Sequence, residues 1–120
     1  MDVIVPGGVS VDLPVSGFAT LYDEMARLRT EVARLKEIFD DHSGLQDRFA
    51  NAGRVSATLA QRLGLVGFAA RASGLPLDLR VRMPCAPYDR LDVRPVTLGN
   101  GDVLARVEVR FAEIVQSLDL

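Results

Sequence analysis

The feature that most constrains the fold is a glycine-rich stretch between residues 53 and 80. It holds four glycines within 22 residues, at Gly53, Gly64, Gly67 and Gly74. Because glycine lowers helix stability, we expect these positions to serve special backbone geometry or a close approach between chain segments. Long segments with helical apolar spacing precede and follow the stretch. The sequence therefore predicts a mainly α (α+β) fold, with two long packed helices joined by a glycine-rich crossover of short helices and a small β element.

The first long helix is expected to start near Ser16 or Gly17 and to end at about Asp41. Its apolar side chains step by four and three residues along one face, the spacing of a helix that packs on another helix. This seam consists of Leu21, Met25, Leu28, Val32, Leu35 and Phe39. It is short for a free coiled coil, so core packing is favoured. Acidic residues oppose the helix dipole at the C-terminal end, which should fray unless arginines from the middle of the chain meet it.

The last helix is expected to begin after Asp102, a suitable N-cap residue. Its apolar residues again step by three and four: Leu104, Val107, Phe111, Ile114 and Leu118. A strand is the local alternative because Val107, Val109 and Phe111 alternate with charged residues, but the length of the pattern favours a helix. The sequence stops at Leu120 without a glycine or proline terminator, which suggests a helix interrupted by the end of the sequence.

Two short helices are expected in the middle of the chain, over 45–51 and 57–63, the second capped by Ser56. The glycine at the end of residues 71–74 predicts a tight turn there. Apolar and polar residues then alternate with period two, which predicts two edge-like strand pieces beside prolines. These pieces cover residues 77–82 and 91–94.

The N-terminal segment is short and β-branched. Val3 to Val5 precede a turn at Pro6-Gly7-Gly8, and alternating valines and a leucine follow up to residue 13. The pattern fits a small hairpin and an extended arm equally well. No GK[ST] sequence follows the two glycines, so a phosphate-binding loop is not favoured.

Composition describes one ordinary globular domain covering residues 1–120, with a net charge of −2. Residues 54–94 carry seven arginines against three acidic residues, whereas nine acidic residues oppose five basic ones before them. Arginine suits bidentate pairing with carboxylates, so the favoured interpretation is pairing with acidic helices of the same chain. The alternative is a docking face for an acidic partner. Nucleic acid is not favoured, since there is no basic run and little aromatic stacking surface.

No apolar run approaches the roughly 20 residues that span a bilayer, so direct membrane insertion is not expected. No secretory signal pattern opens the chain, and the default expectation is a cytoplasmic protein. Cys85 is the single cysteine and His42 the single histidine. A nucleophile needs a base within reach, and the whole crossover separates this pair in sequence. We therefore expect Cys85 to be a packing residue, His42 to be exposed or capping, and the chain to hold no catalytic, cofactor-binding or metal site.

Four segments in this order and spacing resemble a known family. They are PGGVSVDLP (residues 6–14), GRVSATLAQRLGLVGFAARASGLPLDLR (53–80), APYDRLDV (86–93) and GDVLARVEVRFAEIVQSL (101–118). Together they resemble the interior of the large subunit shared by respiratory complex I and membrane-bound nickel–iron hydrogenases. The complex I member is the NADH-quinone oxidoreductase D subunit, and the hydrogenase members include the large subunit of formate hydrogenlyase. The most specific parts are ARASG (residues 70–74) and DLR (78–80).

The resemblance implies that this chain is a central, truncated piece of a longer large subunit. That subunit would support electron transfer to quinone or protons, while the piece itself is expected to be inactive. A nickel–iron centre or a quinone, with neighbouring iron–sulfur clusters, would belong to other parts of the assembly. The family commonly has an aromatic residue where this chain has Cys85, which puts any role of that position in doubt. Family-motif positions without an assigned role are Arg71, Asp78, Arg80, Tyr88 and Asp102.

The resemblance also implies partners and a location. The partners would be the other subunits of a membrane-bound oxidoreductase complex, peripheral on the inner face of the cell membrane. The different class of function that the sequence leaves open is a free-standing helical module that self-associates, for example as a homodimer, with no redox role. For the family positions, buried ion pairs and turn caps are favoured over a direct redox role.

Overall fold

The structure is a computed structural model and describes residues 4–6 and 8–120. It is mainly helical, as the sequence predicts, and measures 47 × 34 × 28 Å along its principal axes. The helices are α1 (Val15–Asp41), α2 (Ser43–Phe49), α3 (Ala57–Arg62), α4 (Gly67–Ala72), α5 (Leu79–Arg82) and α6 (Val103–Asp119). The strands are β1 (Ile4–Val5) and β2 (Gly8–Val9).

The two strands form an antiparallel hairpin in which Ile4 faces Val9 and Val5 faces Gly8. The hairpin alternative for the N-terminal segment is therefore confirmed. The predicted strand residue Val3 and turn residue Gly7 lie outside the described residues. Beyond the hairpin, the chain runs without regular structure to Pro14, where α1 begins.

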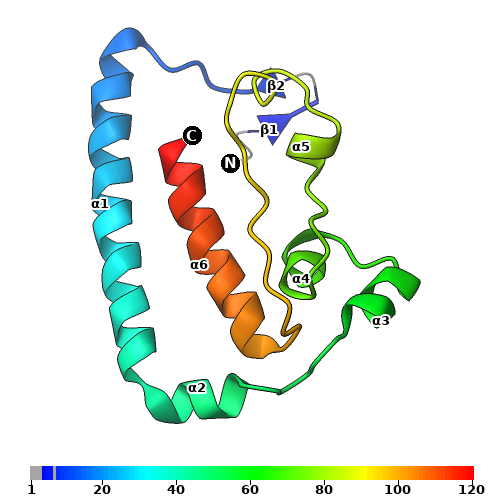
Figure 1. Ribbon diagram of the computed structural model, residues 1–120. Helices are drawn as coiled ribbons and strands as arrows, with labels where there is room; N and C mark the ends of the chain where they lie inside the picture. The colour runs from blue at the N-terminus through cyan, green and yellow to red at the C-terminus, as the bar shows by residue number, and fades with distance from the viewer. Residues whose placement is uncertain (1–3, 7) are drawn as a thin grey trace.

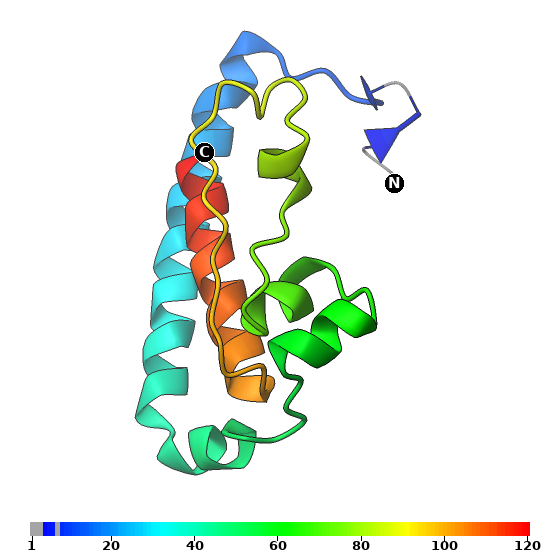
Figure 2. The same ribbon diagram turned by 45° about the vertical axis from the view of Figure 1, so that its right-hand side comes forward.

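The two long helices lie side by side, as Figures 1 and 2 show from two directions. Helix α6 lies between α1 on one flank and α4 on the other, and it contacts both. The rings of Phe39 and Phe111 join α1 to α6 with centroids 5.9 Å apart, and Phe49 of α2 stacks on Phe39 at 6.3 Å. Helix α6 is therefore the central element of the fold.

The end of α1 is held by residues other than the expected arginines. Lys36 pairs with Asp40 one turn away and with Glu108 of α6 at 3.3 Å. The Gln46 side chain donates hydrogen bonds to the carbonyls of Phe39 and Asp40, at 3.1 and 2.8 Å. These contacts satisfy carbonyls that a helix end leaves without partners. The condition stated from the sequence, that this end frays unless arginines from the middle of the chain meet it, is met by Lys36 and Gln46 instead, because α2 lies beside the end of α1.

Two predicted strand pieces are absent from the structure. Residues 79–82 form α5, because the Asp78 carboxylate accepts a hydrogen bond from Arg80 N at 3.0 Å and caps a helical turn. Residues 91–94 are irregular, and neither piece has a neighbouring strand that could satisfy its backbone groups. The tight turn predicted at 71–74 is also shorter, since Arg71 and Ala72 close α4 and the turn covers only Ser73 and Gly74.

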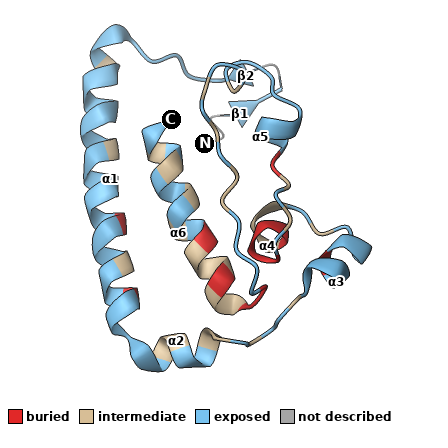
Figure 3. Cartoon of the chain, in the orientation of Figure 1, coloured by how far each residue is buried: buried red, intermediate tan, exposed pale blue. Residues whose placement is uncertain are grey.

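The remaining helix predictions are confirmed within two residues. Ser56 Oγ accepts a hydrogen bond from Leu59 N at 3.2 Å and caps α3, and Asp102 caps α6. The fully packed core is small and lies where α4 meets α6. It consists of Ala72, Ala105 and Val109, with Phe68 and Val96 packed against it. Figure 3 shows buried residues concentrated on α4 and the first half of α6, while α1 is almost entirely exposed.

Candidate functional site at the junction of α4 and α6

Arg71 is the buried centre of the junction between α4 and α6. It is 9% exposed, and its Nε pairs with the carboxylate of Glu113 on α6. Its Nη1 donates a hydrogen bond to the carbonyl of Leu77 at 2.9 Å. A buried charge is costly unless it is paired and hydrogen-bonded, and both conditions are met here. The expected pairing of middle-region arginines with an acidic helix of the same chain is confirmed for this residue.

Asp78 and Arg80 form a second ion pair beside the first. Arg80 donates from Nε at 3.1 Å and from Nη2 at 2.8 Å to the Asp78 carboxylate, which is 5% exposed. These hydrogen bonds outweigh burial and hold the pKa of Asp78 below its ordinary value. The Arg80 guanidinium also lies over the Tyr88 ring, 5.9 Å from its centroid. The structure thus brings four of the five motif positions, Arg71, Asp78, Arg80 and Tyr88, to one place.

Asp102, the fifth position, lies elsewhere. It caps α6 about eleven residues before Glu113, which at the rise of a helix is a distance of roughly 16 Å. Its carboxylate is 3% exposed and accepts hydrogen bonds from Ala105 N at 2.8 Å and Asn51 N at 2.9 Å. Burial raises the pKa of Asp102, but these hydrogen bonds and the charge of Arg106 outweigh it, so the pKa is lowered. Asp102 therefore ties the chain after α2 to the start of α6.

Three chain segments cross tightly next to Asp102. Gly101 N donates to the Ala72 carbonyl at 2.9 Å, and Val55 N donates to the Gly101 carbonyl at 2.9 Å. Gly101 has a φ of +69°, and a Cβ placed on it would lie 2.0 Å from the Val55 carbonyl oxygen. The hydroxyl of Ser73, 1% exposed, is also enclosed here and has no hydrogen-bond partner among the described residues. Only glycine fits this crossing.

A cavity of about 410 Å³ opens beside the Arg71 and Asp78 pairs. Its walls come from the start of α4, the segment before α5, and α5 itself. The lining residues are Val66, Gly67, Arg71, Leu77, Asp78, Leu79 and Arg82. The cavity is largely apolar but has charged groups converging on it, which is the usual character of a small-molecule site.

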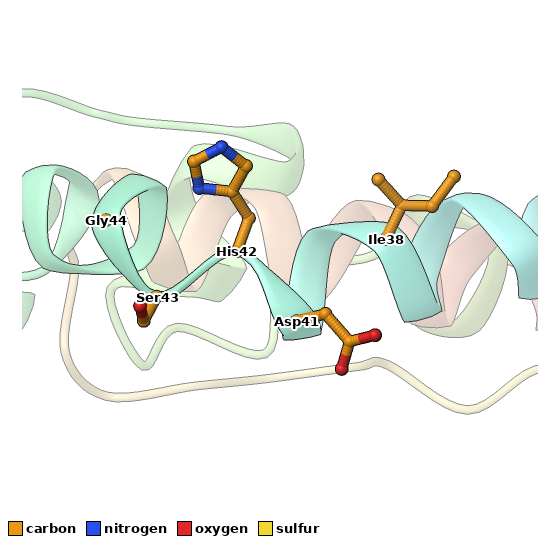
Figure 4. A pocket seen from close by; sticks show the side chains of 5 residues that line it. All are labelled: Ile38, Asp41, His42, Ser43 and Gly44. Atoms are coloured by element: carbon orange, nitrogen blue, oxygen red, sulfur yellow. The ribbon is translucent and has the colours of Figure 1, made fainter.

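A second hollow, at the corner between α1 and α2, includes none of the motif positions. It has a volume of about 490 Å³ and is lined by Ile38, Asp41, His42, Ser43 and Gly44. Figure 4 shows the His42 ring and the Asp41 carboxylate on opposite sides of the ribbon. His42 Nδ1 instead accepts a hydrogen bond from Leu45 N at 3.3 Å, which makes it the N-cap of α2. This hollow therefore offers no acid–base pair.

The donor set does not fit a nickel–iron centre or another metal cluster. The single cysteine of the chain, Cys85, is exposed, so the prediction that it is a packing residue is wrong. The loop that holds it lies beyond α5, at the opposite end of the molecule from the α1–α2 corner. Across residues 4–6 and 8–120, no three histidine, cysteine, aspartate or glutamate side chains gather as metal ligands. None of the helices in that same part of the chain has the length and apolarity needed to traverse a bilayer.

Several residues of the junction are not evident from the sequence. Glu113 does not stand out in it, although a buried arginine requires a carboxylate partner and an acidic residue on the last helix is the available source. The sequence places Gly101 only within a turn, because its steric role depends on Val55, which is distant in sequence. The ion pairs of two other arginines are local. Arg80 pairs with Asp78 and Arg94 with Asp92, each two residues away, and among the described residues neither side chain forms an ion pair with a long helix.

Comparison with known proteins gives a consistent picture. The whole chain, residues 1–120, matches the family described as "Respiratory-chain NADH dehydrogenase, 49 Kd subunit". It is 32% identical over 115 residues to the D subunit of the NADH-quinone oxidoreductase of Cutibacterium acnes, covering 96% of this chain and 27% of that protein. It is 31% identical over 115 residues to the NADH-ubiquinone oxidoreductase 49 kDa subunit of Cafeteria roenbergensis, covering 96% of this chain and 29% of that protein.

A relative whose name combines two subunits, C and D, has a similar sequence identity to this chain. The C/D subunit of the NADH-quinone oxidoreductase of Phocaeicola vulgatus is 32% identical over 114 residues, which cover 95% of this chain and 22% of that protein. The chain thus spans about a quarter of the length of the curated relatives it matches.

Proposed function

The chain belongs to the 49 kDa (D) subunit family of the respiratory-chain NADH dehydrogenases, and we propose that it supplies a helical scaffold within such a subunit. One observation carries this proposal: the charged motif residues form their hydrogen bonds with other parts of the same chain. Arg71 holds α4 to α6, Asp78 holds α5, and Asp102 holds α6 to the chain after α2. Groups used in this way position helices and are not presented to a reacting substrate.

We further propose that the intact assembly carries electrons to quinone, as the names of the relatives state for those proteins. The chain's partners would then be the other subunits of an NADH-quinone oxidoreductase. The assembly would sit peripherally on the inner face of a cell membrane. Because the relatives are named NADH-quinone oxidoreductases, we favour the complex I branch over the hydrogenase branch. Quinone and iron–sulfur clusters would be held by other segments and subunits, and this chain alone would be inactive.

A segment exchange tests the scaffold role. The 115 matching residues of the Cutibacterium acnes D subunit would be replaced by this chain, and assembly of the complex would be followed on native gels with NADH-quinone reductase activity. We expect the chimera to assemble, and the same chimera with Gly101→Ala to fail because its crossing cannot form. If the unmodified chimera is present at normal level but stays outside the complex, the scaffold proposal is wrong.

A metal measurement tests the proposed inactivity. Purified chain incubated with nickel or iron salts should retain neither metal stoichiometrically after desalting, because its donors do not fit such a centre. About one tightly held metal per chain would contradict the proposal.

A second candidate function is self-association, and one row of leucines favours it. Leu21, Leu28 and Leu35 are spaced by seven residues on α1 and are 41%, 51% and 56% exposed. A regular exposed apolar row of this kind is typical of a helix–helix contact. Sedimentation equilibrium of the purified chain, compared with Leu28→Gln, tests it. A dimer that the substitution weakens supports self-association, and a monomer at all concentrations excludes it.

A further inference from the structure

We propose that the cavity beside Arg71 binds a small organic anion with an apolar body, such as a medium-chain carboxylate. This goes beyond the scaffold role, which uses Arg71 only to hold helices together. Three features of the cavity carry the inference: an incompletely used buried cation, a second cation at the rim, and apolar walls with exposed surface.

The buried cation is Arg71, which is 9% exposed and is one of the residues that line the cavity. Its Nη1 donates to the carbonyl of Leu77, and both residues line the cavity. Its Nε donates a hydrogen bond to the Glu113 carboxylate, whereas its Nη2 donates no hydrogen bond to any described residue. A guanidinium has five N–H donors in a fixed fork, so donors remain for a carboxylate placed in the cavity.

The rim cation is Arg82, the last residue of α5. It is exposed, and across residues 4–6 and 8–120 its side chain forms no ion pair or hydrogen bond. The one acidic group in the lining, Asp78, is already neutralised by the Arg80 side chain at 2.8 Å. The charge left facing the cavity is therefore positive. Arg71 is likewise neutralised by Glu113, so the net positive charge comes from Arg82. A carboxylate would gain hydrogen bonds from Arg71 and electrostatic attraction from Arg82, and a cation would be repelled.

The apolar walls argue for a ligand with a hydrocarbon body. Val66 and Leu79 line the cavity, yet they are 75% and 73% exposed, and Leu77, which also lines it, is half-buried. A hydrocarbon body seated there would remove this surface from water, at about 25 cal/mol for each Å² buried. The volume of about 410 Å³ lies within the range of small-molecule pockets. An inorganic anion would leave the walls exposed, so the cavity fits an amphiphile better.

A titration of the purified chain tests the site. Octanoate at pH 7, where its carboxyl group is ionised, would be added to isotope-labelled chain while backbone amide resonances are followed. We expect saturable shifts centred on residues 66–82. Uncharged 1-octanol should bind at least about fivefold more weakly, because it loses the attraction of Arg82 as the Arg82→Gln variant does. Octylammonium should bind more weakly still, because Arg82 repels it.

Matched variants separate this site from general apolar binding. Arg82→Gln should weaken octanoate binding about fivefold, the effect of losing about 1 kcal/mol from one partly solvated charge pair. Arg62→Gln, on exposed α3 outside the cavity, should leave the affinity unchanged. Binding of 1-octanol as tight as octanoate would overturn the proposal, as would shifts centred on the leucine row of α1. Absence of saturable octanoate binding would also overturn it and would favour a polypeptide segment as the occupant.

Discussion

Helix α1 and the junction of α4 with α6 differ in how much of their surface is buried. Helix α1 has 27 residues, of which Val32 and Phe39 alone are buried. Helix α4 has six residues, and its last three, from Ala70 to Ala72, are all buried. The junction adds buried polar groups that are hydrogen-bonded across segments distant in sequence, such as Asp102 with Asn51. The longer helix of this pair, α1, therefore contributes a smaller fraction of its residues to the core than the shorter helix, α4.

The apolar seam of α1 explains the contrast. It consists of two rows with a spacing of seven residues, and α6 buries only one of them, although Leu28 of the other row borders a hollow beside α6. Met25, Val32 and Phe39 form the covered row, which is half-buried or buried. Leu21, Leu28 and Leu35 form the open row. The core of the junction, Ala72, Ala105 and Val109, has no such open row, because Phe68 and Val96 pack against it. We expect substitutions that break the crossing or the buried ion pair of the junction to lower the free energy of unfolding far more than substitutions in the open row of α1.

The largest effect is expected from Gly101→Ala. The new Cβ would lie 2.0 Å from the Val55 carbonyl oxygen, so the three segments at the crossing must separate. We expect a loss of more than about 4 kcal/mol in the free energy of unfolding, or no folded protein, measured by urea denaturation followed by circular dichroism.

Gly64→Ala is the matched control for backbone strain. Gly64 has a φ of +63°, close to that of Gly101, but a Cβ there has no heavy atom within 4 Å. Its expected loss is about 1 kcal/mol, from the left-handed conformation alone. Equal losses for the two variants would mean that the crossing is not tight and that the junction does not depend on close approach.

The next effect is expected from Arg71→Met. The substitution removes one partner of an ion pair whose side chains are 10% and 18% exposed, leaving Glu113 buried without its cation. We expect a loss of about 3 kcal/mol in the same denaturation experiment.

The double variant Arg71→Met with Glu113→Met should recover much of the loss, since neither charge then remains buried. Arg94→Met removes an exposed pair, with side chains 78% and 73% exposed, and should cause no measurable change. A loss that the double variant does not reduce would show that the ion pair is not the cause.

How far the sequence predicts this molecule follows from the range of the interactions involved. The helix caps at Ser56 and Asp102 are local, and their sequence signals are sufficient. The seam of α1 is also correct as a pattern, but a pattern does not reveal how many partners cover it. The prediction of strands at 77–82 and 91–94 is wrong, because these alternating segments have no neighbouring strand with which to pair. At residues 79–82 the Asp78 cap stabilises a helical turn instead. At the site, the resemblance singles out the motif residues, and the Arg71–Glu113 pair follows only from the three-dimensional fold.

A smaller effect, dependent on pH, is expected from Asp102→Asn. At pH 7 the variant should lose about 1–2 kcal/mol, because a charged acceptor of two backbone hydrogen bonds is replaced by a neutral one. The pKa of Asp102 is lower in the folded protein than in the unfolded chain, for which the ordinary value is 3.8. The unfolded chain therefore binds the proton first as pH falls. The stabilisation is complete above about pH 5 and is lost as pH drops below about 4 towards the folded pKa.

The measurement is the difference in unfolding free energy between wild type and Asp102→Asn across pH 7 to 3. We expect the difference to shrink below about pH 4, where Asp102 becomes protonated in the unfolded wild-type chain but is still ionised in the folded protein. Asp47→Asn, at an exposed position on α2, is the control for replacing a carboxylate away from the junction, and should leave the free energy of unfolding at pH 7 unchanged. A difference that stays constant down to pH 3 would contradict a role for the ionised carboxylate.

The smallest effect is expected in the open row of α1, which can be compared directly with the covered row. Val32→Ala removes two methyl groups from a side chain that is 7% exposed, and should lower the free energy of unfolding by about 1–2 kcal/mol. Leu28→Ala removes more carbon atoms, but from a side chain that is 51% exposed, and should change the free energy by no more than about 0.5 kcal/mol. Denaturation at low protein concentration separates folding from self-association. Equal losses of unfolding free energy for Val32→Ala and Leu28→Ala at low concentration would mean that the open row is covered within the single chain. A loss for Leu28→Ala that grows with protein concentration would instead indicate that a second chain covers the open row.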